Sequence, residues 1–174
     1  TRSIWRLEDV DDSAGAYADG DEVIRRAQAA GGDAAKQWVW SGYANRGVAN
    51  RRRGEFNQSL KDIDKALGLA ADGKRASVYL LRGQTYEAMK DYDSAIRDLT
   101  EAIHLNSQFA AAYHERAECY GRKQDFEAGL RDINRAIELD GKTPWFYTRR
   151  AALLEALGRT SEAAADRRKA KELE

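Results

Sequence analysis

Apolar residues recur with a helical period along most of this chain, in stripes separated by short polar joints. Four such joints are RGEF at 53–56, KDYD at 90–93, KQDF at 123–126 and GRTS at 158–161. A stripe, a short joint and a second stripe predict a helix, a turn and a helix. A single proline, Pro144, and an abundance of Ala, Arg, Glu, Asp and Leu also favour helix. We therefore predict an all-α fold.

The helical pairs form a repeating segment. Matching contexts surround Ala66, Ala102, Ala136 and Ala170, and the aromatic residues Tyr43, Tyr79, Tyr113 and Tyr147 stand near the start of each segment. The last three segments are spaced by 34 residues, and the first is two residues longer, with the surplus in the polar stretch 70–75. Because neither helix of a pair can bury its apolar face alone, neighbouring segments must stack around a continuous core.

Several positions agree when the segments are counted from Trp40, Ala76, Ala110 and Pro144. An aromatic residue is fourth, Gly or Ala is eighth, a small residue is twentieth and Ala is twenty-seventh. The eighth positions are Gly47, Gly83, Ala117 and Ala151, and the twentieth are Ser59, Ala95, Gly129 and Ala163. Small side chains at these positions predict sites where helices approach too closely for a large residue, so a substitution such as Gly83→Leu would overpack the contact.

This pattern resembles the tetratricopeptide repeat family over residues 40–174. The resemblance implies a right-handed superhelix of stacked antiparallel helical hairpins, a solenoid with repeats at 40–75, 76–109, 110–143 and 144–174. It also implies that the first helices of the repeats line a concave groove. The family's proline near the end of each repeat is missing, because Ser107 and Gly141 stand in its place. We expect those joints to bend differently.

The two ends of the chain differ from its middle. Arg167 and Lys171 replace apolar residues of the earlier repeats, which predicts a polar C-terminal cap over Ser161 to Glu174. Residues 1–39 read as an acidic arm and a capping helix, which resembles half of a degenerate repeat. We expect that helix at about 21–30, with Asp21 as its N-cap and Gly31 and Gly32 as its stop. Thr1 to Gly20 would be loosely held, with Trp5 as an anchor.

An arginine in each first helix is matched by an aspartate sixteen residues later. The pairs are Arg46 with Asp62, Arg82 with Asp98, Arg116 with Asp132 and Arg150 with Asp166. A partly buried guanidinium needs a carboxylate to offset its lost hydration, so we predict bidentate pairs, either within a helical hairpin or between adjacent repeats. The alternative is a ladder of arginines that binds a polyanion, although four aspartates would neutralise it.

Composition narrows the class of protein. The chain holds 29 Lys and Arg against 29 Asp and Glu, a balance that argues against a general nucleic-acid binder. Seven acidic residues lie within residues 1–22. No apolar run approaches the roughly 18 residues of a membrane helix, and the single Cys119 cannot form an intramolecular disulfide. We expect a soluble protein, either cytoplasmic or bacterial periplasmic.

Catalytic and metal-binding motifs are missing from the sequence. It contains no GxSxG, GxxxxGK[ST] or GxGxxG. His114 and Glu118 lie four residues apart, but two ligands without a third are a weak metal signal. The acidic run at 8–12 lacks the Gly and Glu of a calcium loop. Cys119 is better explained as a buried packing residue than as a reactive thiol. We expect no enzyme activity, no cofactor and no metal.

The family resemblance assigns groove-facing positions to each first helix. They are Asn45, Arg51, Arg52, Gln84, Glu87, His114, Glu118, Arg122, Trp145 and Arg149, with Glu155 beyond them. Family members that clamp the C-terminal carboxylate of a chaperone carry Lys and Asn at the fifth and ninth positions of one repeat. The pairs at those positions in this chain are Ala44 with Val48, Leu80 with Gln84, and His114 with Glu118. We therefore expect a non-enzymatic interaction module or scaffold that binds another protein, as an extended peptide or helix, by other chemistry.

Two alternatives stay open. Trp5, Trp38 and Trp40 could mediate self-association into a homo-oligomer, and helical repeats can bind RNA, although the balanced charge makes RNA the weaker alternative. We also expect the acidic stretch from Glu8 to Glu22 to screen in part three cations of the groove, Arg51, Arg52 and Arg149.

Overall fold

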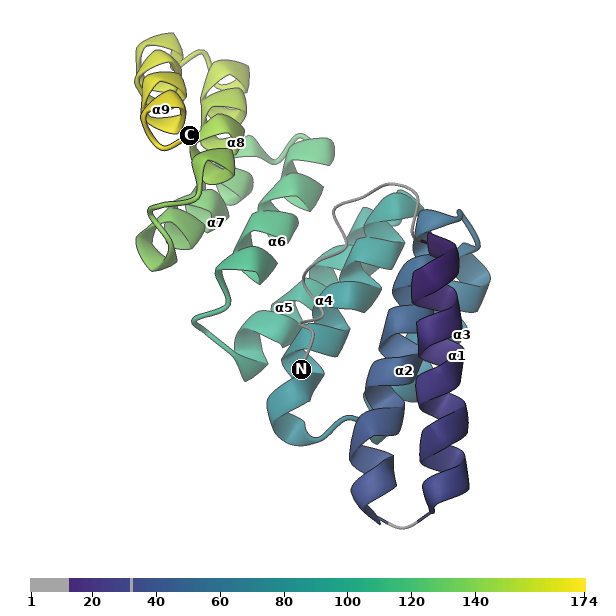
Figure 1. The fold of residues 1–174 in the computed structure, drawn as a ribbon. Helices are drawn as coiled ribbons and strands as arrows, with labels where there is room; N and C mark the ends of the chain where they lie inside the picture. Colours follow the sequence, from purple (N-terminus) through teal and green to yellow (C-terminus); the bar gives the residue numbers. More distant parts are fainter. Residues whose placement is uncertain (1–12, 32) are drawn as a thin grey trace. The chain divides into compact units, whose positions relative to one another are not determined.

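The computed structural model describes residues 13–31 and 33–174 of the chain. Over those residues it consists of nine helices joined by short turns, with no strand, so the predicted all-α fold class is confirmed (Figure 1). The chain divides into two compact units, the first ending at Met89 and the second spanning Lys90–Glu174. Each unit is described by itself.

The first unit contains four helices in its described part. They are α1 (Ser13–Ala30), α2 (Asp33–Arg52), α3 (Phe56–Leu69) and α4 (Asp72–Ala88). Each helix packs on the next one along the chain, so that α2 lies between α1 and α3 (Figure 1). Ala44, Ile63, Ala66 and Val78 form the buried cluster between α2, α3 and α4. The apolar stripes of the sequence therefore meet at this cluster.

The N-terminal capping helix is longer than the sequence predicts. Helix α1 begins at Ser13 rather than near residue 21, so Asp21 is not its N-cap but lies in its interior. Gly20, predicted to lie in a loosely held arm, is instead buried against α2. The two helices are so close here that a Cβ on Gly20 would lie 2.9 Å from the carbonyl oxygen of Gly42. Close packing of two glycines outweighs the low helix propensity of Gly20. Gly31 follows the helix with a φ of +60°, as a stop residue should.

The remaining predictions for the N-terminal region concern the arm, its anchor and its acidic residues. Residues 1–12 and Gly32 lie outside the described residues, and so does the predicted anchor Trp5. Of the acidic residues at 8–22, Asp21 pairs with Arg46, while Glu22 pairs with Arg25 and Arg26 on its own helix. These two carboxylates therefore pair with arginines of the first unit that are not among the groove cations named in the prediction.

The second unit contains five helices. They are α5 (Tyr92–Leu105), α6 (Ala110–Arg122), α7 (Phe126–Leu139), α8 (Pro144–Ala156) and α9 (Thr160–Glu172). A continuous buried cluster joins α6, α7, α8 and α9, and its members are Ala117, Leu130, Ile133, Ala136, Phe146, Ala151, Leu153, Leu154 and Ala163. Stacked hairpins therefore share one core in this unit, as the sequence predicts.

First helices of successive repeats touch each other, and second helices do not. In the first unit α2 contacts α4, and in the second unit α6 contacts α8. Among the described residues no matching contact joins α1 to α3, α5 to α7 or α7 to α9. Each unit is therefore curved, with its first helices on the inner side. We call the solvent side of α2 and α4 in the first unit, and of α6 and α8 in the second, the first-helix face of that unit.

Small residues lie where helices approach most closely, as predicted. A Cβ on Gly47 would lie 2.7 Å from Cγ1 of Ile63, and a Cβ on Gly129 would lie 3.1 Å from the carbonyl oxygen of Ala117. Ser59, at a predicted small position, is fully buried and shares a 3.1 Å hydrogen bond with the hydroxyl of Thr85. The small residues thus set the distance between paired helices.

The joints between repeats are closed by side chains rather than by proline. Asp140 accepts a hydrogen bond from the backbone N–H of Lys142 and another from the hydroxyl of Thr143. Asn106 accepts one from the N–H of Gln108 at the preceding joint. Such turns, in which an Asn or Asp side chain accepts from the backbone two residues on, direct the chain without proline.

The exposed surface of helix α9 is polar. Arg167 and Lys171 are exposed, as predicted for a C-terminal cap, and Arg167 pairs with Glu155 of α8 at 2.8 Å. Ala163 and Ala170 are the buried side of the helix.

Candidate partner-binding face

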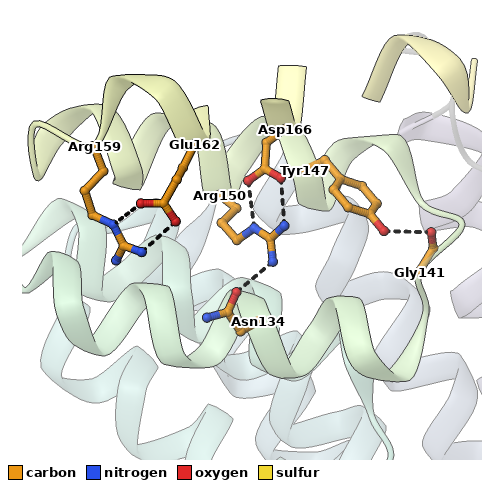
Figure 2. A network of polar contacts seen from close by, with 7 residues as sticks. All are labelled: Asn134, Gly141, Tyr147, Arg150, Arg159, Glu162 and Asp166. Carbon is orange, nitrogen blue, oxygen red and sulfur yellow. Dashed lines mark hydrogen bonds and ion pairs between the residues drawn. The ribbon is translucent and has the colours of Figure 1, made fainter. Parts of the chain in front are cut away.

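Paired arginines and aspartates hold each first helix in place. Arg150 donates from Nε and Nη2 to the two carboxylate oxygens of Asp166, both at 2.7 Å, and Figure 2 shows this fork. Arg46 with Asp62 and Arg116 with Asp132 are arranged alike. Three of the four predicted bidentate pairs are therefore confirmed. The two residues of the fourth pair, Arg82 and Asp98, belong to different compact units, and that pair stays a prediction.

Each of these guanidinium groups also reaches the helix that precedes its own. Its third nitrogen, Nη1, donates to a polar side chain there: Asp21 for Arg46, Asp64 for Arg82, Thr100 for Arg116 and Asn134 for Arg150. The sequence left open whether the pairs form within a hairpin or between repeats, and the guanidinium bridges both. Asp166 raises the pKa of Arg150 by its hydrogen bonds, against the effect of burial. Arginines held in this way are structural, which disfavours the polyanion ladder.

A tyrosine lies beside each of these arginines. The guanidinium carbons of Arg46, Arg82, Arg116 and Arg150 lie between 5.4 and 5.8 Å from the ring centroids of Tyr43, Tyr79, Tyr113 and Tyr147, respectively. The Tyr147 hydroxyl donates to the carbonyl of Gly141 (Figure 2). The aromatic fourth position of each repeat therefore covers the arginine of the seventh.

Groove residues predicted in the first unit lie on α2 and α4. Nη2 of Arg51 donates to Oε1 of Gln84 at 3.3 Å and so connects the two first helices. Asn45 and Glu87 are half-buried, and Arg52 is exposed. The structure thus brings Arg51 and Gln84 together at the first-helix face of this unit.

Four of the predicted residues in the second unit form one cluster across α6 and α8. Nε of Arg149 lies 3.0 Å from a carboxylate oxygen of Glu118, and its guanidinium carbon lies 4.2 Å from the ring centroid of Trp145. The ring centroids of His114 and Trp145 are 6.4 Å apart. Trp145 is 50% exposed, so an indole is presented to solvent at the first-helix face. Arg122 is exposed at the end of α6.

The electrostatics of this cluster follow from burial and pairing. Burial lowers the pKa of His114, and the Arg149 cation lowers it further, while Glu118 opposes both. His114 is therefore neutral at neutral pH. Its Nε2 atom is buried without a hydrogen-bond partner. The contact of Arg149 with Glu118 is an ion pair without hydrogen-bond geometry at Nε.

Sequence reasoning missed Phe146 as part of this arrangement. Phe146 is buried, and its ring stacks on His114 with centroids 5.3 Å apart and an interplanar angle of 30°. It stands next to Trp145, but the two neighbours point in different directions, one into the core and one to solvent. The apolar character of Phe146 indicated burial, whereas its contact with an imidazole from another repeat depends on how α6 and α8 pack.

Other candidate chemistry is weakly supported by the described residues. Among them no three His, Cys, Asp or Glu side chains gather as metal ligands would, and Glu118 is engaged by Arg149. Cys119 is buried, as predicted for a packing residue. No helix in the described part of the chain is both long and apolar enough to cross a membrane.

Comparisons with known proteins agree with this architecture. The family model described as tetratricopeptide repeat matches residues 76–109 and 110–143. A structure of the Arabidopsis OM64 tetratricopeptide repeat domain is 33% identical, with a TM-score of 0.58, and the match covers 60% of this chain and 86% of that one. Among curated proteins, none matches this chain closely enough to count as a relative.

Two further solved structures share the fold. A crystal structure of MamA matches with a TM-score of 0.72 at 22% identity, covering 95% of this chain and 94% of that chain. The second tetratricopeptide repeat domain of Spaghetti, solved with the HSP90 peptide SRMEEVD, matches with a TM-score of 0.58 at 28% identity. That match covers 59% of this chain and 95% of the other.

Repeats of helical hairpins with small residues at their contacts define this protein as a helical repeat protein. The chain belongs to the tetratricopeptide repeat family.

Proposed function

We propose that this protein is a non-enzymatic interaction module whose first-helix faces bind an extended peptide or a helix of a partner protein. The observation that carries the proposal is the cluster of His114, Glu118, Trp145 and Arg149 on α6 and α8. Aromatic and arginine side chains on a rigid, curved surface are the residue types that dominate binding energy at protein interfaces.

Three considerations support this function. The exposed indole of Trp145 is held by Arg149, so its position is set before a partner arrives. The arginines of the seventh position are engaged in structural pairs, which leaves the first-helix face to carry recognition. A related fold, the Spaghetti domain, was solved with a bound peptide.

The experiment selects peptides from a random library displayed on phage, using the immobilised protein as bait. Selected peptides are synthesised, and their dissociation constants are measured by calorimetry on the wild type, on Trp145→Ala and on Leu105→Ala. Leu105 is an exposed apolar residue of α5, a second helix, and serves as the matched control. We expect Trp145→Ala to weaken binding by about tenfold or more, and Leu105→Ala to leave it unchanged. Failure to select any peptide that depends on Trp145 would refute the proposal.

Self-association is a second candidate, because Trp38 on α2 is 64% exposed. Trp40, which was also expected to contribute, packs against the core cluster of the first unit instead. If Trp38 mediates a homo-oligomer, light scattering should show an oligomer for the wild type and a monomer for Trp38→Ser. A monomeric wild type at micromolar concentration eliminates this candidate.

A further inference from the structure

The cluster of His114, Glu118, Trp145 and Arg149 indicates the chemistry of the group that it binds. Its only cation, Arg149, is ion-paired with Glu118 at 3.0 Å, and the side chain of Glu118 is 19% exposed. The arginine charge is therefore neutralised within the protein. A carboxylate from a partner would have to compete with Glu118 and would meet that negative charge as well.

The histidine adds no charge to the cluster. Its environment contains one carboxylate, Glu118, and one guanidinium, Arg149, together with the rings of Trp145 and Phe146. Burial keeps the imidazole neutral at neutral pH. The net charge of the four side chains is therefore close to zero.

The most exposed side chain of the cluster is the indole of Trp145. Trp145 presents half of its surface to solvent, more than Arg149 at 33% or Glu118 at 19% of their side chains. Arg149 lies over the indole, so the ring is held rather than free to rotate. Contact with another apolar side chain contributes most to the binding free energy of a rigid, uncharged aromatic surface, because little conformational entropy of the ring is lost on binding.

We propose that the cluster is a subsite for an uncharged apolar anchor, an aliphatic or aromatic side chain of the partner segment, and that Glu118 excludes acidic anchors from it. This inference rests on the proposed function and names the chemistry of its partner at Trp145. Glu118 is in this view a specificity-determining residue. It stabilises Arg149 and repels a carboxylate at the same place.

The test uses small probes in place of an unidentified partner. N-acetyl-leucinamide and N-acetyl-phenylalaninamide are the neutral probes, and the N-methylamide of N-acetyl-aspartate is the acidic one. Each is titrated into the full chain while the indole N–H of Trp145 is followed by proton–nitrogen NMR, with Trp145→Phe to assign that resonance. We expect the neutral probes to shift the Trp145 resonance at concentrations at which the acidic probe still leaves it in place, so that the acidic probe binds more weakly.

Glu118→Gln is the matched variant, because it removes the charge and keeps the shape. We expect it to strengthen binding of the acidic probe by about two- to fivefold and to leave the neutral probes unchanged. Circular dichroism confirms that the variant is folded, and Glu87→Gln, on the first-helix face of the first unit, controls for a general loss of negative charge. Equal binding of both probe types by the wild type, or an acidic probe indifferent to Glu118→Gln, would overturn the inference.

The two proposals fail separately. If phage selection yields no peptide that depends on Trp145, the partner-binding function is wrong. If it yields peptides that place a carboxylate at Trp145, the function stands and the neutral-anchor inference is wrong.

Discussion

Arg116 and Asp132 form a two-bond fork between α6 and α7, with Nε and Nη2 of the arginine 2.7 and 2.8 Å from the two carboxylate oxygens. The side chains are 16% and 10% exposed, so each charge depends on the other for compensation. The same geometry recurs in the pairs of Arg46 and Arg150. Buried pairs of this kind need not add net stability, but breaking one leaves a charge without its partner.

A double-mutant cycle on this pair should therefore show strong coupling. We expect Asp132→Ala to lower the free energy of unfolding by about 2–4 kcal/mol, since it strands the Arg116 guanidinium. Arg116→Leu strands Asp132 and should cost a similar amount. In urea unfolding, the loss of free energy in the double variant should be smaller than the sum of the two single losses by about 1 kcal/mol or more. Strictly additive losses would show that the fork contributes no coupling.

Gly47 should be intolerant even of alanine. A Cβ at this position would lie 2.7 Å from Cγ1 of Ile63 and 3.3 Å from the carbonyl oxygen of Ser59. We expect Gly47→Ala to destabilise the protein by about 1–3 kcal/mol through overpacking. Gly68→Ala is the control, because nothing lies within 4 Å of its Cβ position in α3. The free energy of unfolding of Gly68→Ala should rise by about 0.5–1 kcal/mol, because alanine has the higher helix propensity. Thermal or urea unfolding measures the stability of both variants. A stable Gly47→Ala protein would contradict the packing.

Turn residues with a left-handed backbone offer a reciprocal test. Gln124 has a φ of 63°, whereas Gly158 occupies the matching turn between α8 and α9 with a φ of 74°. Only glycine adopts this conformation without strain. We expect Gln124→Gly to raise the free energy of unfolding by about 0.5–1 kcal/mol, and Gly158→Gln to lower it by about 1 kcal/mol. Chemical unfolding of both variants measures the sign of each change in the free energy of unfolding. Changes of the same sign would argue against backbone strain at Gln124.

His114 should make stability depend on pH. Because burial lowers its pKa in the folded protein, the unfolded chain binds the proton first as the pH falls below about 6.5. The free energy of unfolding contributed by this group is fully present above that pH and decreases as the pH falls. We expect His114→Gln to lose less stability than the wild type between neutral pH and about pH 5 in urea unfolding.

His104→Gln is the control for that experiment. His104 is exposed near the end of α5, so this variant removes an imidazole without changing the packing around His114. Parallel pH profiles for wild type and His114→Gln would contradict the assignment.

Much of the fold could be predicted because repetition makes local patterns informative. Four matching sets of small residues indicated where helices touch, and Gly47 and Gly129 do lie at such contacts. The spacing of sixteen residues correctly predicted Arg46 with Asp62, since an arginine of a first helix and an aspartate of its paired second helix recur at one offset.

The start of α1 could not be predicted in the same way. Glycines at residues 15 and 20 and acidic residues near Asp21 resemble a helix start in local terms. Close packing of Gly20 on Gly42, together with the pairing of Asp21 with Arg46, stabilises a helix that begins at Ser13. A contact with α2 thus outweighs local propensity.

The sequence by itself determined the helical class, the period of the repeats, the residues that face the core and the partners within one hairpin, because each depends on spacing along the chain. Tertiary structure decided which contacts join one repeat to the next. The third hydrogen bond of Arg150 to Asn134 and the ion pair of Arg149 with Glu118 are of this kind. They depend on the distance and angle between packed helices, which the volumes of many side chains set together.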